Sequence, residues 1–162
     1  IGTLNHILIG DILWLKRFAR HPSGYRTLEP ILAIDDPASL REIRYLDLAE
    51  LRAARGRMDQ MIVDWCAEVR EEDLARPLAY QDFAGRPHCK NLGGLALHLF
   101  LHQIHHRGQV TTLLSQAGID FGDTDLPELL PEEGPMLGGG AATAEGGSRL
   151  ADGIEKRYGE VR

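Results

Sequence analysis

The sequence has few cysteines, no surplus of positive charge and no long hydrophobic run. Its two cysteines, Cys66 and Cys89, lie far apart and form no CxxC pair, which excludes a disulfide framework and a thiolate zinc cluster. The formal net charge of −6 argues against nucleic acid or an anionic membrane as a partner. No apolar stretch approaches the roughly 18 residues of a membrane span, and no signal-peptide pattern is present. These absences predict a cytoplasmic protein.

What is present is the composition of one globular domain. Hydrophobic residues make up 43% of the chain and charged residues 26%, and a chain of 162 residues can bury a core without a structural metal. The composition then shifts to "MLGGGAATAEGG" near the C-terminus. We therefore predict a folded domain over residues 1–133. Residues 134–162 are expected to be a Gly-rich linker and a tail with a short helix.

Apolar residues at helical spacing predict three long helices. They recur every three or four residues in "TLNHILIGDILWLKRF", which predicts a helix over about 3–19. A second helix, over about 47–70, begins with "DLAE", where Asp47 is the expected N-cap. A third, over about 91–117, ends at Gly118, a residue type common just beyond helix ends.

The two segments between these helices have different patterns. Residues 20–46 mix proline, glycine and aspartate with short apolar runs, which predicts a long connection with one helical turn at "ASLREI". The segment "LAYQDFAGRPHCKN" alternates around a glycine, which predicts a β-hairpin at about 78–90. The expected fold is therefore all-α with one short hairpin before the last long helix.

The stretch "HLFLHQIHHRGQV" at 98–110 holds four of the seven histidines in the chain. On a helix, the pairs His98/His102 and His102/His106 are each four residues apart and can present two imidazoles to one ion. An acid/base site is harder to support, because the motif supplies no carboxylate within a turn to orient a histidine. Two interpretations therefore stay open: a metal site on either histidine pair, or a helix whose histidines only pack.

Residues 102–106 match the spacing of the zinc-peptidase pattern HExxH, but Gln103 stands where that pattern has its glutamate. A neutral amide cannot accept the proton of a water molecule, which argues against a peptidase of that type. A metal site here needs a third ligand from elsewhere in the chain. His6, on the first predicted helix, is the best candidate, although a histidine in an apolar helix is more often a core residue.

Together, "TLNHILIGDILWL" at 3–15 and "HLFLHQIHHRGQV" at 98–110 resemble the DinB family of the DinB/YfiT-like metalloenzymes. The hairpin segment and "DLPELLPEE" also fit the family, so the resemblance covers about 1–133. It implies a four-helix bundle, often a homodimer, that binds a divalent metal through three histidines. Nickel or zinc is expected first, then manganese or iron. The ligands implied by the resemblance are His6, His102 and His106.

The resemblance also marks residues around the site. The Asp, Trp, Arg and Gln of the family motifs correspond to Asp11, Trp14, Arg107 and Gln109. We expect Asp11 and Arg107 to form an ion pair, and Gln109 or His105 to lie near the metal. The alternative, that all of these residues only pack or cap, stays open.

Two departures from the family pattern matter. The family has a helix before the "TLNH" motif, whereas this sequence begins at that motif. An exposed apolar face is therefore expected, to be covered by a partner subunit or by the C-terminal segment. Leu101 stands where the family commonly has asparagine, which removes a polar group from the motif.

Three histidine ligands leave positions open for water or substrate, as in a catalytic metal site. Because some relatives in the wider superfamily are thiol-dependent transferases, the resemblance favours an enzyme that activates a low-molecular-weight thiol, or water, at the metal. It would then act as a thiol S-transferase or a hydrolase. The alternative is a non-catalytic, dimerising helical protein that the ion only holds together.

Overall fold

The computed structural model describes residues 1–131 of the chain. Residue contacts divide the chain into two units, 1–120 and 121–162. The described part of the second unit contains the short 3-10 helix η2, Leu126–Leu129. The predicted Gly-rich linker and tail at 134–162 lie outside the described residues.

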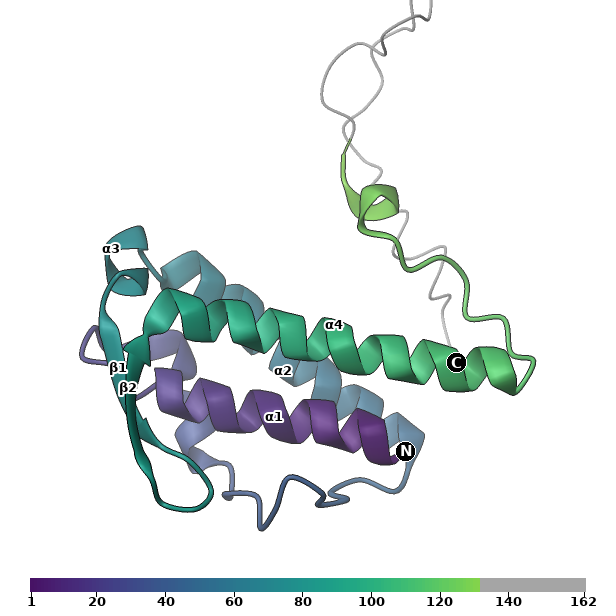
Figure 1. Cartoon of the computed structure of the whole chain (residues 1–162), viewed down its shortest axis with the longest axis horizontal. Helices are drawn as coiled ribbons and strands as arrows, with labels where there is room; N and C mark the ends of the chain where they lie inside the picture. Colours follow the sequence, from purple (N-terminus) through teal and green to yellow (C-terminus); the bar gives the residue numbers. More distant parts are fainter. Residues whose placement is uncertain (132–162) are drawn as a thin grey trace, which may run out of the picture. The chain divides into compact units, whose positions relative to one another are not determined.

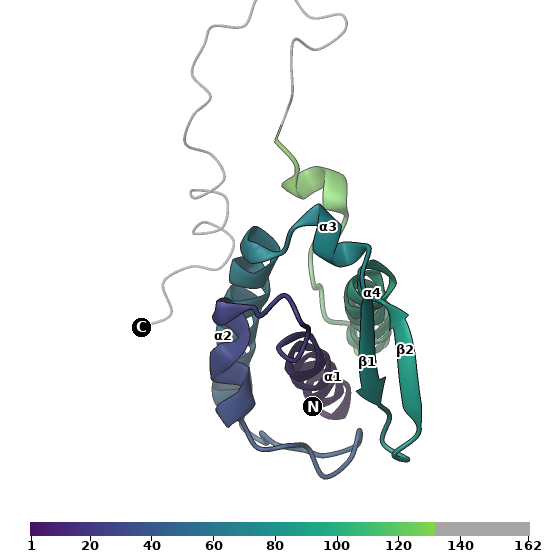
Figure 2. The same ribbon diagram turned by 90° about the vertical axis from the view of Figure 1, so that its left-hand side faces the viewer.

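Three long helices make up most of the first unit (Figure 1). They are α1 (Gly2–Phe18), α2 (Leu48–Glu68) and α4 (Leu92–Gln116). Helix α1 contacts both of the others and lies between them (Figure 2). The three predicted helices and the all-α class are confirmed, with bounds close to the predicted ones. None of the described helices is long and apolar enough to cross a membrane.

Local sequence signals set most of the helix ends. The Asp47 carboxylate accepts a hydrogen bond of 2.9 Å from the Glu50 backbone N–H, as the capping pattern predicted. Asn91 caps α4 in the same way, because its side-chain oxygen accepts from the Gly94 N–H at 2.9 Å. Gly118 follows α4 with a φ of +70°, a conformation that side chains disfavour and glycine allows.

The connection after α1 differs from the prediction. The helical turn expected at "ASLREI" is absent, because the Glu42 carboxylate accepts from the Ala38 N–H and holds this segment as an irregular turn. A 3-10 helix, η1 (Arg26–Ala33), forms earlier in the connection. Its first N–H groups donate to the carboxylate of Glu68 on α2, at 2.8 and 3.0 Å, a tertiary contact that sequence patterns do not contain.

The predicted hairpin is confirmed as β1 (Pro77–Gln81) and β2 (Pro87–Asn91), which pair antiparallel with Pro77 opposite Asn91. It follows one unpredicted helical turn, α3 (Glu71–Leu74). The hairpin leads directly into α4 and contacts α1 as well, so it lies at one end of the long helices (Figures 1 and 2).

The core lies between α1, α2, η1 and the first half of α4. Its largest buried side chains include Trp65 and Phe18, whose rings stack with centroids 4.9 Å apart. This core packs the three helices against one another through apolar contacts. The outer face of α4 carries exposed apolar residues, which include Leu97, Leu101 and Ile104.

Candidate metal centre

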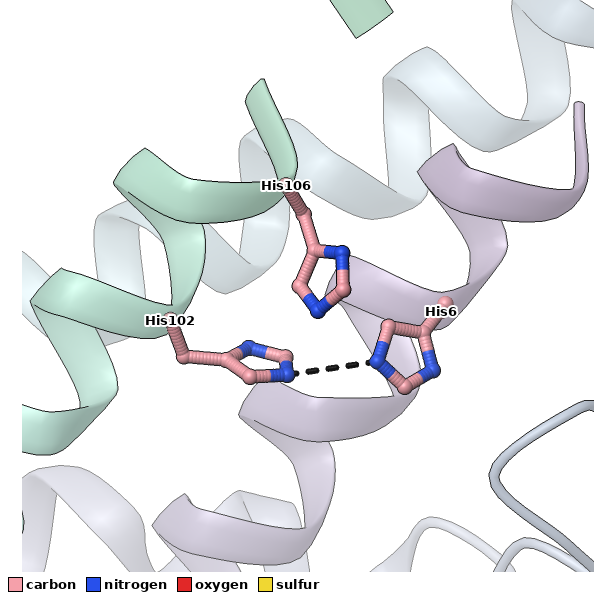
Figure 3. Close-up of side chains that lie close together, drawn as sticks. All are labelled: His6, His102 and His106. Atoms are coloured by element: carbon pink, nitrogen blue, oxygen red, sulfur yellow. Dashed lines mark hydrogen bonds between the residues drawn. The ribbon is translucent and has the colours of Figure 1, made fainter. Parts of the chain in front are cut away.

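Helices α1 and α4 bring His6, His102 and His106 together (Figure 3). The Nε2 atoms of His6 and His102 are 3.2 Å apart. The ring of His106 lies with its centroid 4.4 Å from each of the other two rings. One ring nitrogen from each of the three side chains lies within 4.8 Å of the other two. The structure thus selects the His102/His106 pair, and not His98/His102, as the partner of His6.

The close approach of the two helices depends on Gly10. A Cβ atom at this position would lie 2.8 Å from Cε1 of His102, closer than side chains pack in proteins. Gly10 therefore makes room for the His102 imidazole against α1. Sequence analysis missed this residue, although a glycine inside a helical pattern is a known signal for close packing.

His6 is oriented by the connection between η1 and α2. Its Nδ1–H donates a hydrogen bond of 2.8 Å to the backbone carbonyl of Leu40, which leaves Nε2 as the unprotonated nitrogen facing the cluster. The neighbouring Asn5, fully buried, fixes the same connection by bonding to the backbone of Arg44 and Tyr45. Asn5 was also missed, and its signal was a polar residue in an otherwise apolar helix face.

His106 is oriented from within α4. Its Nδ1–H donates to the side-chain oxygen of Gln109 at 2.7 Å, so its Nε2 is likewise free of a proton. The amide nitrogen of Gln109 in turn donates to Nε2 of His105 at 3.2 Å. The structure thus places Gln109 and His105 directly behind His106, one step outside the three-histidine cluster.

His102 is the most perturbed of the three histidines. Burial lowers its pKa to about 4, and the neighbouring imidazoles of His106 and His6 act in the same direction. Its Nδ1 is buried and has no hydrogen-bond partner in the described part of the chain. His102 is therefore neutral at ordinary pH, which is the form of imidazole that binds metals.

These donors fit a divalent ion. A tetrahedral ion with metal–nitrogen bonds of about 2.1 Å separates its nitrogen ligands by about 3.4 Å. The His6–His102 spacing of 3.2 Å is close to this value, and the ligand nitrogen of His106 lies within 4.8 Å of both. Within residues 1–131, no other group of three or more His, Cys, Asp or Glu side chains is close enough to share an ion.

Asp11 belongs to a different cluster, and the predicted Asp11–Arg107 ion pair is wrong. The carboxylate is fully buried, pairs with Arg55 of α2 and accepts a hydrogen bond of 2.9 Å from Gln103. Burial raises the pKa of Asp11, and the Arg55 charge and the Gln103 hydrogen bond oppose this shift. Arg107 instead lines a cavity of about 480 Å³ together with Gln103 and Arg55. Gln103 and Arg107, both on α4, therefore face α2.

Comparison with known proteins supports the family interpretation. The DinB family model matches residues 2–135, which is most of the chain. No curated protein and no solved structure gives a significant match.

Proposed function

The chain belongs to the DinB family, and we propose that it binds one divalent metal ion through Nε2 of His6, His102 and His106. The observation that carries this proposal is the hydrogen bonding of His6 and His106. Each donates its Nδ1–H to an acceptor outside the cluster, so that the unprotonated Nε2 faces inward. Metal-binding histidines commonly have such an outer partner, whereas histidines that merely pack do not need one.

Nickel and zinc are the ions we propose first. Imidazole nitrogen suits zinc, nickel and iron, whereas manganese prefers carboxylate and water oxygens. The cluster contains three imidazoles and no carboxylate, which ranks manganese below the other three ions.

Three protein ligands leave at least one coordination position for a small molecule, and a bound ion would lower the pKa of a thiol or water placed there. The roles of the protein are to hold three imidazoles in position and to keep them partly shielded from solvent. We propose a thiol S-transferase that acts on a low-molecular-weight thiol. Hydrolysis is the alternative reaction, in which the metal activates water in place of the thiol. This step rests on the resemblance to thiol-dependent relatives.

A second candidate function is a non-catalytic metal-binding protein that dimerises. The exposed apolar face of α4, with Leu97 and Leu101 each more than half exposed, favours it. In that case the ion stabilises the helix pair, and a second copy of the chain covers the apolar face.

Titration with Co²⁺, whose absorption spectrum reports its ligands, tests both functions. We expect wild type to bind about one ion per chain, His102→Ala and His106→Ala to bind none, and His98→Ala to bind as wild type does. Cysteine or glutathione added to the cobalt protein should then produce a sulfur-to-cobalt charge-transfer band. An unchanged spectrum would favour the non-catalytic function. Equal cobalt binding by wild type and His106→Ala would overturn the metal site itself.

The reaction is tested separately with the same thiols and an electrophile such as 1-chloro-2,4-dinitrobenzene. In a transferase the thiolate sulfur displaces chloride from the ring carbon, and the thiol proton passes to the buffer. The rate should depend on the metal, fall on chelation and recover when metal is restored. A rate that is the same for wild type and His102→Ala would contradict metal-dependent transfer.

A further inference from the structure

A second pocket lies beside the three-histidine cluster. It has a volume of about 460 Å³ and is lined by residues of α1, the hairpin and the first half of α4, among them Trp14, Tyr80, Lys90 and His98. The proposed metal ligands are not part of its lining, so the pocket is a separate feature of the same surface.

A row of rings links this pocket to the cluster. The His98 ring centroid is 5.8 Å from that of His102 and 5.1 Å from that of Trp14. Trp14 in turn lies 5.4 Å from Tyr80. Because His98 both lines the pocket and neighbours His102, a molecule bound in the pocket has one end within about one side-chain length of the cluster.

The two large rings are held in fixed positions. The guanidinium of Arg17 lies 4.5 Å from the Trp14 ring centre and 4.8 Å from that of Tyr80, which is the geometry of a cation–π contact. Arg17 also donates a hydrogen bond to the Gln81 carbonyl at 3.1 Å and so ties α1 to β1. Rings that are already ordered lose little conformational freedom when a ligand packs against them.

The polar groups left for a ligand are a cation and a histidine. Lys90 is exposed and has no ion-pair partner within the described residues, and the His98 ring has no hydrogen bond there. Asn91 is not available, because its amide caps α4 and donates to the Leu74 carbonyl. An unpaired ammonium at a pocket with aromatic walls favours an organic anion.

We propose that this pocket binds an organic anion with a flat or apolar body. Its carboxylate lies on Lys90, its body packs against Trp14 and Tyr80, and its other end passes His98 towards the metal. The identification of this molecule as a substrate rests on the proposed function. Binding in the pocket, however, does not require the metal.

The test uses two unreactive probes that differ in charge, 2-naphthoate and its neutral amide 2-naphthamide, with affinities measured by calorimetry. For wild type we expect naphthoate to bind roughly fivefold more tightly than the amide, the effect of one exposed charge pair. Lys90→Gln should remove this preference and Lys90→Arg should keep it. Arg41→Gln, which removes an exposed cation elsewhere, should behave as wild type, and Trp14→Leu should weaken both probes.

Line broadening in the NMR spectrum of naphthoate tests the connection to the cluster. Paramagnetic Co²⁺ in wild type should broaden the probe signals, whereas His106→Ala, which is expected to bind no ion, should still bind naphthoate without broadening. Four outcomes would overturn the inference. Two concern the wild-type protein: equal affinity for the two probes, or no binding of either. The other two are an unchanged preference in Lys90→Gln and bound naphthoate whose signals are not broadened in the cobalt protein. If the protein prefers naphthoate but binds no metal, the proposed anion pocket stands and only the proposed function is overturned.

Discussion

The two sides of the contact between α1 and α4 have opposite chemistry. Consecutive residues are divided between them: Gly10 and His102 lie on one side, and Asp11 and Gln103 on the other. On the first side, three imidazoles face one another, and the cluster contains no carboxylate. On the second, a buried carboxylate is matched by the guanidinium of Arg55 and by an amide N–H.

This difference assigns metal binding to the histidine side and stability of the fold to the Asp11 side. The Asp11 side has its charge compensated within the protein, so it holds α1, α2 and α4 together without an external ligand. The histidine side brings one ring nitrogen from each of three imidazoles within 4.8 Å of the other two, an arrangement that a cation completes. Substitutions on the Asp11 side should therefore change the free energy of unfolding, whereas substitutions on the histidine side should change metal affinity.

The largest effect is expected for Asp11→Ala. It leaves Arg55 and Gln103 without their shared acceptor and should lower the free energy of unfolding by about 3–5 kcal/mol, measured by urea denaturation of the metal-free protein. Asp59, which also contacts Arg55 at 2.8 Å but is 59% exposed, is the matched control. Asp59→Ala should cost less than about 1 kcal/mol. Equal losses in the two variants would contradict a special role for Asp11.

Metal addition should stabilise the protein only through the histidine side. At a free ion concentration one hundred times its Kd, wild type should gain about 2.7 kcal/mol in the free energy of unfolding. Asp59→Ala should gain the same amount, and His102→Ala should gain nothing. If the ion stabilised His102→Ala as much as wild type, its binding site would have to lie elsewhere.

Gly10→Ala should weaken metal binding without unfolding the helix. The new methyl group would displace the His102 ring, and we expect a loss of about 10- to 100-fold in affinity, as for other residues that orient metal ligands. Gly56→Ala on α2 is the matched control, because its Cβ would have no neighbour within 4 Å. The control should leave metal affinity unchanged and raise stability by up to about 1 kcal/mol. A Gly10→Ala protein with wild-type affinity would show that the close approach is not required.

The smallest effect is expected for Gln109→Ala. Loss of the acceptor for the His106 Nδ1–H should reduce metal affinity about tenfold, the lower end of the range for such outer partners. Gln116→Ala, on an exposed position in the last turn of α4, should have no effect in the same calorimetric titration. Similar affinities for the two variants would mean that solvent can replace Gln109.

Features set by neighbours in sequence were predictable. The three helices follow from apolar periodicity, and Asp47 begins α2 as its capping pattern predicted. The spacing of His102 and His106 placed both on one face of α4, but spacing alone did not exclude His98. His6, on another helix, was the best candidate for a third ligand, but helix periodicity does not say which helices are neighbours, and only the family resemblance implied that it joins this pair.

Features set by packing between distant segments were not predictable. Asp11 was assigned to Arg107, yet its partner Arg55 comes from α2, whose position beside α1 is fixed by the core. The Leu40 carbonyl that orients His6 lies in an irregular connection whose path no local pattern describes. Gln103, whose neutral amide argued against a zinc peptidase of the HExxH type, links α4 to the buried Asp11.

We propose that three imidazoles from α1 and α4 bind one ion and leave it open to a small molecule. X-ray absorption spectroscopy of the zinc-loaded wild-type protein shows the ligands of the ion themselves. We expect three imidazole nitrogens at about 2.0–2.1 Å, with the remaining position filled by a solvent oxygen that an added thiol replaces with sulfur. A shell of four protein ligands, or the same spectrum from His102→Ala, would contradict it.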